Sequence, residues 1–348
     1  MVNLIDLALL AKEPNFVAKG VMELISWLFN GIGNYGWAVV VFTLILKLAL
    51  SPLDIWQKNV MTKNNRAMER MKPQLEKLQK QYGGNKELYS QKQMELYRKE
   101  KYSMMGACLP TLLTMVIFIM VFSGFNGMIS QQNKKMYLEM EGAYNSAYTA
   151  TVGEPTAKRE AAETAVLKAY EDNYEKGAGF LWVRNVFMPD GWKKAIPDYE
   201  TFTGKGLGKL SIGTDIFSDD PMSTYNKVML PLQNKYNNRW NGFLILPLLS
   251  ILVSFASQKL MKQEQPPTPP SNGANGQDMQ GAMQANMKMM QYFLPLMLGV
   301  FAVFYSTAFT IYMVTSSILT TLFQLTYNII AKKIDKRNEE ARLKTTYK

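Results

Sequence analysis

Long apolar runs alternate with polar segments along this chain, and five of the runs are long enough to cross a membrane. A helix of about 20 apolar residues spans the ~30 Å hydrocarbon core of a bilayer at ~1.5 Å per residue. The pattern therefore predicts an all-α membrane protein, built as a bundle of five transmembrane helices. The five runs cover residues 36–56, 104–125, 240–260, 291–309 and 310–331.

Two polar segments between the runs carry their own helical patterns. Residues 57–82 have apolar residues at helical spacing, and a Gly83-Gly84-Asn85 turn follows. Residues 86–101 have a second apolar stripe at the same spacing. This pattern predicts an antiparallel helical hairpin. Pro73 is expected to kink the first helix or to break it briefly. The pattern fits a solvated coiled-coil spacer as well as a docking device.

The segment 126–239 is too long for a simple loop. Within it, residues 156–174 are rich in Ala and Glu and predict a helix that stops near Gly177. Ahead of the first run, residues 16–29 predict a short amphipathic helix in the membrane interface. Residues 1–35 lack a basic start and a small-residue cleavage site, so no secretory signal is expected.

The charges are unevenly distributed over the polar segments. The net charge is +7 over residues 58–103 and +4 over residues 332–348, whereas it is zero over residues 126–239. Cytoplasmic loops carry an excess of Lys and Arg. The pattern predicts a multi-pass membrane protein with a cytoplasmic hairpin, a basic cytoplasmic C-terminal tail, a long extracytoplasmic loop and an N-terminus outside.

These boundaries divide the chain into nine parts. The first four are an N-terminal segment with the interfacial helix (1–35), the first transmembrane helix (36–57), the hairpin (58–103) and the second transmembrane helix (104–125). The extracytoplasmic insert (126–239), the third transmembrane helix (240–260) and a Pro- and Gly-rich cytoplasmic linker (261–288) follow. The fourth and fifth transmembrane helices (289–331) and the basic tail (332–348) end the series.

The first run contains a lysine near its middle. Trp37 and Trp56 stand near the two ends of the run, where amphipathic rings favour the headgroup region. Lys47 lies about 15 Å along the helix from each of them. A charge at that depth costs on the order of 3 kcal/mol, so an isolated lysine that faces lipid is not expected.

The neighbours of Lys47 indicate which way the lysine points. Thr43, Lys47, Ser51 and Asp54 follow at steps of four, four and three, which places them on one helical face. Asp54 is ~10 Å from Lys47 along the axis and too distant for a direct ion pair. A carboxylate on another span is the alternative partner, but the other apolar runs contain no Asp or Glu. A hydrated cavity inside the membrane is therefore expected at Lys47.

Polar residues in two other runs are expected to line the same cavity, because each would be costly in hydrocarbon without water or a partner. They are Thr114 in the second run and Thr315, Ser316 and Ser317 in the fifth.

The sequence offers little for catalysis. It contains no histidine and a single cysteine, Cys108. These counts remove the commonest general base and exclude a disulfide framework or a Cys/His metal site within the chain. Gly204, Gly206 and Gly208 do not form a GxxxxGK[ST] phosphate loop. No enzyme activity, cofactor, metal site or catalytic residue is expected.

Several segments in this order resemble the bacterial YidC-type membrane protein insertases of the YidC/Oxa/Alb family. The segments that carry the resemblance are GNYGWAVVVFTLILKLALSPL at 33–53, MKPQLEKLQKQYGGN at 71–85, GACLPTLLTMVIF at 106–118, FLWVRNVFMPD at 180–190 and FLPLMLGVFAVFYSTAFTIYMVTSSILTTLFQ at 293–324. The resemblance covers most of residues 20–335 and implies a five-helix bundle with a hydrophilic groove open to cytoplasm and lipid.

The resemblance also implies a function, residue roles and partners. The chain would act as an insertase and chaperone that inserts nascent membrane proteins into the bacterial plasma membrane and helps them to fold. Lys47 stands where the family usually has a groove arginine, and it would attract acidic translocating segments. Thr114, Met313 and Ser317 depart from the glutamine, tryptophan and asparagine that are common at their positions. Residues 134–178 would be a lineage-specific insertion. The implied partners are nascent membrane proteins, membrane lipid, the ribosome through the tail and hairpin, the Sec translocon and the signal recognition particle receptor.

Two other functions are compatible with part of the pattern. A channel or secondary transporter would also explain a buried lysine, but should show acidic residues within spans or inverted repeats. A membrane-tethered scaffold with a coiled-coil arm would explain the hairpin and would leave Lys47 unexplained.

Overall fold

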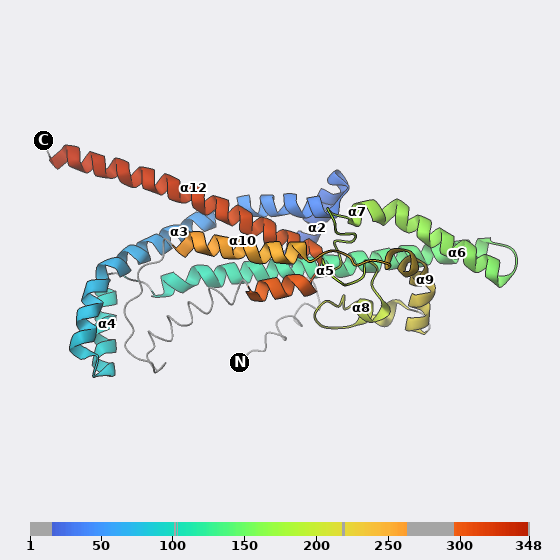
Figure 1. Cartoon of the computed structure of the whole chain (residues 1–348), viewed down its shortest axis with the longest axis horizontal. Helices are drawn as coiled ribbons and strands as arrows, with labels where there is room; N and C mark the ends of the chain where they lie inside the picture. Colours follow the sequence, from blue (N-terminus) through green and yellow to red (C-terminus); the bar gives the residue numbers. More distant parts are fainter. Residues whose placement is uncertain (1–15, 101, 103, 218–219, 263–295, 347–348) are drawn as a thin grey trace.

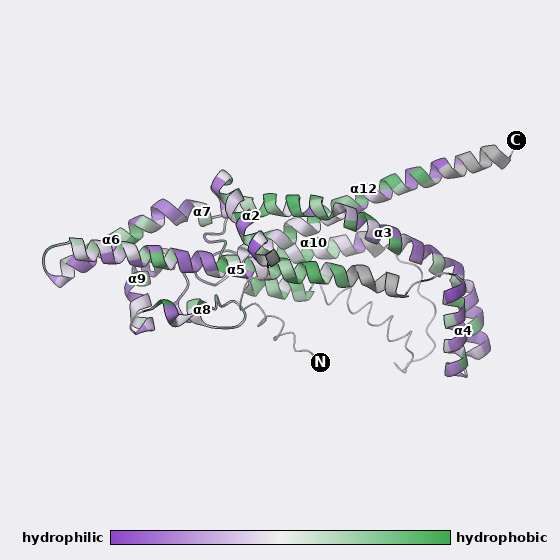
Figure 2. Cartoon of the chain, turned by 180° about the vertical axis from the view of Figure 1, so that it is seen from behind, coloured by the Kyte–Doolittle hydropathy of each residue, from purple (hydrophilic) through white to green (hydrophobic). Residues whose placement is uncertain are grey.

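The computed structural model describes residues 16–100, 102, 104–217, 220–262 and 296–346, and within these ranges the regular structure is helical. The molecule is elongated, with an apolar central bundle between two polar ends (Figures 1 and 2). Among the described residues, three helices are long and apolar enough to cross a membrane, and a fourth apolar helix is shorter. They are α3 (Tyr35–Tyr82), α5 (Met104–Ala150), α12 (Thr307–Thr346) and the shorter α10 (Ile245–Lys262).

The predicted fourth span lies partly outside the described residues. Residues 296–304 are helical, and the chain then breaks at Tyr305 and Ser306 before α12 begins. A Cβ on Gly299 would lie 2.2 Å from the Ile251 side chain, so this short helix packs closely against α10. The break was expected between residues 309 and 310. It comes earlier because Ser306 accepts a hydrogen bond from the Phe309 backbone N–H at 3.3 Å, as an N-cap residue does.

Helix α3 runs for 48 residues from the bundle into the hairpin. It bends as it leaves the bundle (Figure 1), but neither Pro52 nor Pro73 interrupts it. Proline removes one backbone hydrogen bond, and the freed carbonyl near the exposed Pro73 can bond to water instead. Of the two expectations for Pro73, a kink or a short break, the break is absent.

Helices α3 and α4 pack against each other where an antiparallel hairpin was expected, and the cytoplasmic location of this hairpin remains a prediction. Helix α4 (Lys86–Lys99) follows a turn in which the Asn85 side chain accepts a hydrogen bond from the Leu88 N–H at 3.1 Å. A small core separate from the main one holds the two helices together. Its buried residues are Ala67, Met71, Leu75 and Leu96.

The second span was expected to end at residue 125, and this boundary is not a helix end. Helix α5 continues without a break to Ala150, and α6 (Pro155–Tyr170) returns along it. A π-helical turn (Glu171–Glu175) and α7 (Lys176–Ala178) follow, so the helix expected over 156–174 is confirmed to within a few residues. We call residues 126–239 the insert.

The insert has an aromatic core of its own. Helices α8 (Tyr199–Thr203) and α9 (Pro221–Tyr236) close over the side of α5. The rings of Tyr137 and Tyr225 stack at 5.6 Å, and Phe202 and Phe217 lie against them. This long-range packing is what keeps α5 helical beyond the apolar run.

Helix α2 (Phe16–Ile32) packs on α3 and α5. The apolar stripe that predicted an interfacial helix faces the protein, because Val21, Ile25 and Leu28 are buried. Gly124 of α5 permits the close approach, since a Cβ there would lie 2.8 Å from Val21. The location of α2 in a membrane interface remains a prediction.

Candidate functional site

The central feature is a row of polar residues on one face of α3, formed by Thr43, Lys47, Ser51 and Asp54. We call it the α3 polar stripe. Lys47 is half-buried, and no described residue forms an ion pair with it. Asp54 is close enough to act on Lys47 electrostatically without touching it. The stripe therefore carries a positive charge in the middle of the apolar part of α3, and no salt bridge within the described residues neutralises this charge.

The hydroxyl groups of the stripe are satisfied by their own helix. Thr43 is fully buried and donates to the Val39 carbonyl at 2.7 Å. Ser51 is partly buried and donates to the Leu48 carbonyl at 2.8 Å. Such bonds to a preceding carbonyl allow hydroxyls inside an apolar helix. Thr43 therefore belongs to the packed part of the bundle.

The other predicted site residues lie on two helices that pack against α3. Thr114 of α5 is exposed and lies 3.5 Å from Nε2 of Gln57, at the edge of hydrogen-bonding distance. Thr315, Ser316 and Ser317 of α12 are partly buried, and Ser316 shares a hydrogen bond with Tyr312. The predicted residues thus come from three neighbouring helices.

Polar contacts tie the helices together on the hairpin side of Lys47. The Tyr327 phenol of α12 donates to Oδ1 of Asn59 at 2.6 Å, and Nζ of Lys58 lies 5.8 Å from the centre of the same ring. The hydroxyls of Ser257 and Thr321 join α10 to α12. These residues were not predicted, because single polar residues at helical spacing do not reveal their partners on distant helices.

The opposite end of the bundle is covered by two loops, residues 180–197 and 237–244, which we call the cap loops. Thr307 at the start of α12 bonds through its N–H and its hydroxyl to the Met188 carbonyl, at 3.0 and 2.7 Å. Phe180 lies against Gly36 and Trp37 at the start of α3. The cap loops therefore join the starts of two long helices on the insert side.

Asp190 holds the cap loops to α10. It is fully buried, and its carboxylate accepts hydrogen bonds from the backbone N–H groups of Phe243, Leu244 and Leu246 at 2.8–3.1 Å. The Trp182 indole donates a further bond at 3.3 Å. A carboxylate at a helix N-terminus satisfies donors that have no partner inside the helix. This arrangement explains why α10 begins at Ile245 and not at Trp240, as the apolar run suggested.

Two buried asparagines complete this network. The Asn241 amide donates to the carbonyls of Asn185, Met188 and Pro189 at 2.8–3.2 Å and accepts from the Asn185 N–H. The segment 180–190 was noticed in the sequence only as part of a family resemblance. Its role in closing the bundle depends on partners more than 50 residues away.

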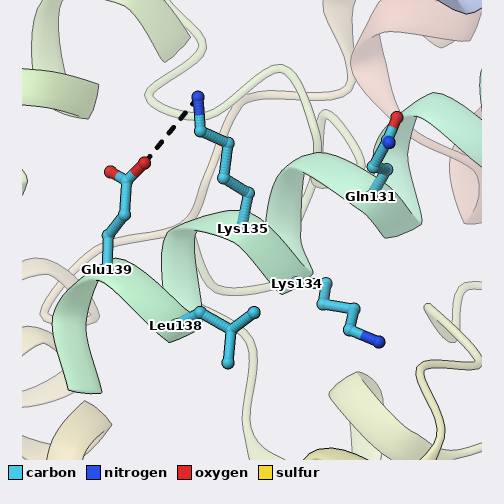
Figure 3. A pocket seen from close by; sticks show the side chains of 5 residues that line it. All are labelled: Gln131, Lys134, Lys135, Leu138 and Glu139. Atoms are coloured by element: carbon cyan, nitrogen blue, oxygen red, sulfur yellow. Dashed lines mark ion pairs between the residues drawn. The ribbon is translucent and has the colours of Figure 1, made fainter. Parts of the chain in front are cut away.

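A shallow hollow of about 360 Å³ lies elsewhere, along the outer side of α5 (Figure 3). Its lining comes from this helix alone and includes a Lys135–Glu139 ion pair at 3.7 Å. The hollow is lined by Gln131, Lys134, Lys135, Leu138 and Glu139. It belongs to the insert and contains no residue of the α3 polar stripe.

Comparison with known proteins accounts for most of this chain. A sequence model of the family described as 60Kd inner membrane protein matches residues 27–336. The matched range contains α3, α5, α10 and most of α12, together with the cap loops.

Individual relatives match a shorter part. The chain is 34% identical over 108 residues to the "Membrane protein insertase YidC" of Thioalkalivibrio sulfidiphilus, which covers 31% of this chain and 19% of the relative. It is 38% identical over 106 residues to the protein of that name in Xanthomonas campestris pv. campestris, with 30% and 18% covered. The matched part spans about a fifth of the length of these relatives.

Proposed function

Since the chain belongs to the 60Kd inner membrane protein family, a family of membrane proteins whose named relatives are insertases and not enzymes, we propose that it inserts nascent membrane proteins into the bilayer. The single observation that carries this proposal is Lys47, a charged and half-buried residue in the middle of the apolar part of α3, without an ion pair among the described residues.

The orientation follows from charge. The hairpin has a net charge of +7, and the end of α12 is also basic. Both lie at the same end of the bundle, which therefore carries the excess of Lys and Arg (Figure 1). We assign this side to the cytoplasm and the insert, whose net charge is zero, to the outside. A substrate would then approach from the hairpin end of the bundle.

The two ends of the bundle differ in a way that suits one-sided access. On the insert side, the cap loops tie the helix starts together through buried hydrogen bonds. On the hairpin side, polar bridges such as Asn59–Tyr327 and Ser257–Thr321 join neighbouring helices. We assign the α3 polar stripe to the wall of a hydrated groove that opens toward the hairpin and ends at the cap loops.

The mechanism we propose is electrostatic. A nascent protein with a short translocated tail must move polar groups across ~30 Å of hydrocarbon, and a wet groove shortens that path. Lys47 attracts acidic residues of the tail more strongly than water would allow, because the groove is partly desolvated. Burial of the apolar substrate helix in lipid supplies the driving force, so no nucleotide is required.

The basic extension of α12 is a candidate contact for the translating ribosome. Helix α12 continues as one helix to Thr346, away from the bundle, and Lys332, Lys333, Lys336 and Arg337 are exposed on it. Binding of such residues to RNA or anionic lipid weakens as salt rises. Removal of residues 336–348 would then lower ribosome co-sedimentation at low salt. Unchanged co-sedimentation would exclude the tail as the contact.

Insertion of matched substrates tests the role of Lys47. The substrates are single-span proteins that differ only in tail charge, and the variants are Lys47→Arg, Lys47→Ala and Lys47→Glu. We expect Lys47→Arg to retain function, Lys47→Ala to impair acidic tails more than neutral ones, and Lys47→Glu to impair acidic tails further.

The pattern of effects separates three readings. An equal loss for all tails with Lys47→Ala would remove the electrostatic role and leave only hydration of the groove. No loss with any variant would show that Lys47 is not the working residue. Normal insertion of small acidic-tailed proteins in cells depleted of this chain would reject the insertase itself and favour a channel or transporter.

A further inference from the structure

Four large apolar side chains of the cap loops are exposed. Leu181, Trp192, Trp240 and Phe243 show 67%, 47%, 58% and 66% of their surface to the outside. We call these four residues the apolar rim. Short loops in contact with water rarely keep so many large apolar groups together, and such a patch usually marks an interaction surface.

Hydrogen bonds bring the two loops of the rim side by side. The Asn241 N–H donates to the Lys193 carbonyl at 2.8 Å, and the Gly242 N–H donates to the Gly191 carbonyl at 3.3 Å. Trp192 is therefore beside the segment that carries Trp240 and Phe243. Leu181 belongs to the turn closed by two bonds of 2.8 Å between Phe180 and Val183, which lies against Trp37.

The helix starts fix the depth of the rim. Phe243 stands two residues before α10, Trp37 lies in the first turn of α3, and Met188 accepts bonds from the first residue of α12. Helices α3 and α12 are long and apolar enough to cross a membrane, and α10 carries a shorter apolar segment. The cap loops are thus level with the headgroup region, where Trp and other amphipathic rings are favoured.

The rim is also continuous with the surface of α10. Beyond Phe243, the first two turns of this helix expose large apolar side chains, which must face lipid if α10 crosses the bilayer. They are Ile245, Leu248, Leu249 and Leu252. Lys193 follows Trp192 and Arg239 precedes Trp240 in the sequence, and both supply charges suited to phosphate headgroups.

The backbone conformation of Leu181 also supports an apolar environment around the rim. Its φ is +53°, a left-handed conformation that is strained for a residue with a side chain and that Gly or Asn would adopt at lower cost. A leucine here gains little from packing inside the protein, because two thirds of it is exposed. An apolar environment outside the protein would offset the cost.

We propose that the cap loops are a membrane foot, with the apolar rim inserted at the boundary between headgroups and acyl chains of the leaflet on the insert side. This anchoring site lies outside the α3 polar stripe and is independent of the insertion mechanism. It would hold the closed end of the bundle at a fixed depth in the bilayer while the hairpin end remains free to move.

Spin labels at single cysteines test the foot. In a Cys108→Ser background, the full chain carries one label at a time from Leu181→Cys, Trp192→Cys or Phe243→Cys. Leu248→Cys on α10 is the lipid-facing control, and Val152→Cys, at a position 95% exposed in the α5–α6 turn, is the aqueous control. The labelled protein is reconstituted into phosphatidylethanolamine–phosphatidylglycerol vesicles. Power saturation of the spin-label spectrum then compares the accessibility of each label to oxygen with its accessibility to a water-soluble nickel chelate.

We expect the rim labels to be several-fold more accessible to oxygen relative to the chelate than the label at 152, and less so than the label at 248. Accessibility equal to that at 152 would place the rim in water and overturn the foot. Low accessibility to both reagents would show protein cover and overturn it equally. The readout is independent of insertion activity, so failure of the foot is distinct from failure of the proposed function.

Discussion

The phenol of Tyr327 donates a 2.6 Å hydrogen bond to Oδ1 of Asn59 and so joins α12 to α3 across 268 positions of the sequence. Both residues lie on the hairpin side of Lys47, beyond the apolar middle of their helices. The bond therefore links α3 and α12 on the hairpin side of the apolar bundle, where the two helices would form opposite walls of the proposed groove.

Tyr327→Phe is expected to weaken this link with little other change, because the ring stays beside Lys58. A hydrogen bond contributes about 0.5–1.5 kcal/mol net to the free energy of unfolding. Because this bond is exposed, we expect a value at the lower end of that range. Unfolding in detergent of the wild type, Tyr327→Phe, Asn59→Ala and the double variant gives the coupling energy by a double-mutant cycle. Additive effects of the two changes would show that the contact does not stabilise the bundle.

The proposed orientation predicts which cysteines react from outside the cell. In a Cys108→Ser background, Val152→Cys in the insert should react with a membrane-impermeant maleimide in intact cells. Met94→Cys in the hairpin, at a position 43% exposed, should react only after the cells are opened. Both side chains are accessible in the folded chain, so the bilayer alone should separate them. Reaction of the hairpin position in intact cells would reverse the assignment.

Asp190→Ala is expected to destabilise the chain strongly. The change leaves the N–H groups of Phe243, Leu244 and Leu246 without their acceptor, and a buried unsatisfied donor costs about 1–3 kcal/mol. Asp190→Asn should cost less, since one oxygen remains to accept.

Thermal unfolding in detergent measures both changes. Glu160→Ala is the control, an exposed acidic residue in the insert that should change stability by no more than about 0.5 kcal/mol. A loss with Asp190→Ala no larger than the loss in this control would mean that the carboxylate does not hold the cap loops.

Stability of the hairpin should fall in alkali. Burial raises the pKa of the Tyr97 phenol to about 12, although a hydrogen bond from Gln93 opposes the rise. A group whose pKa is raised by folding contributes stability below its unfolded pKa of about 10 and loses it as pH rises through the folded pKa. The packing of α4 on α3 should therefore loosen between about pH 10 and 12.

The distance between spin labels on the two hairpin helices reports this opening, and tyrosinate absorbance follows the titration. Tyr97→Phe removes the titrating group and keeps the ring in the small hairpin core. We expect this variant to stay closed over the same pH range. Identical opening of the variant and the wild type would assign the alkaline transition to other groups.

The sequence by itself determined the features that depend on neighbours within one helix. Each apolar run predicts a membrane-length helix because its composition is local, and α3, α5 and α12 bear this out. The hairpin was predictable for the same reason, since its stripe and its turn lie within about 45 residues. Lys47 stood out because a charge in hydrocarbon is costly wherever its helix packs.

The tertiary structure decided what depends on distant partners. Helix α5 passes residue 125 because Tyr137 packs on residues more than 60 positions later. Helix α10 starts at Ile245 because Asp190 accepts bonds from its first turn, and Leu181 keeps a left-handed backbone that its sequence disfavours. Periodicity cannot reveal these contacts, because the free energy of a buried hydrogen bond or ring contact depends on partners that only the folded chain brings together.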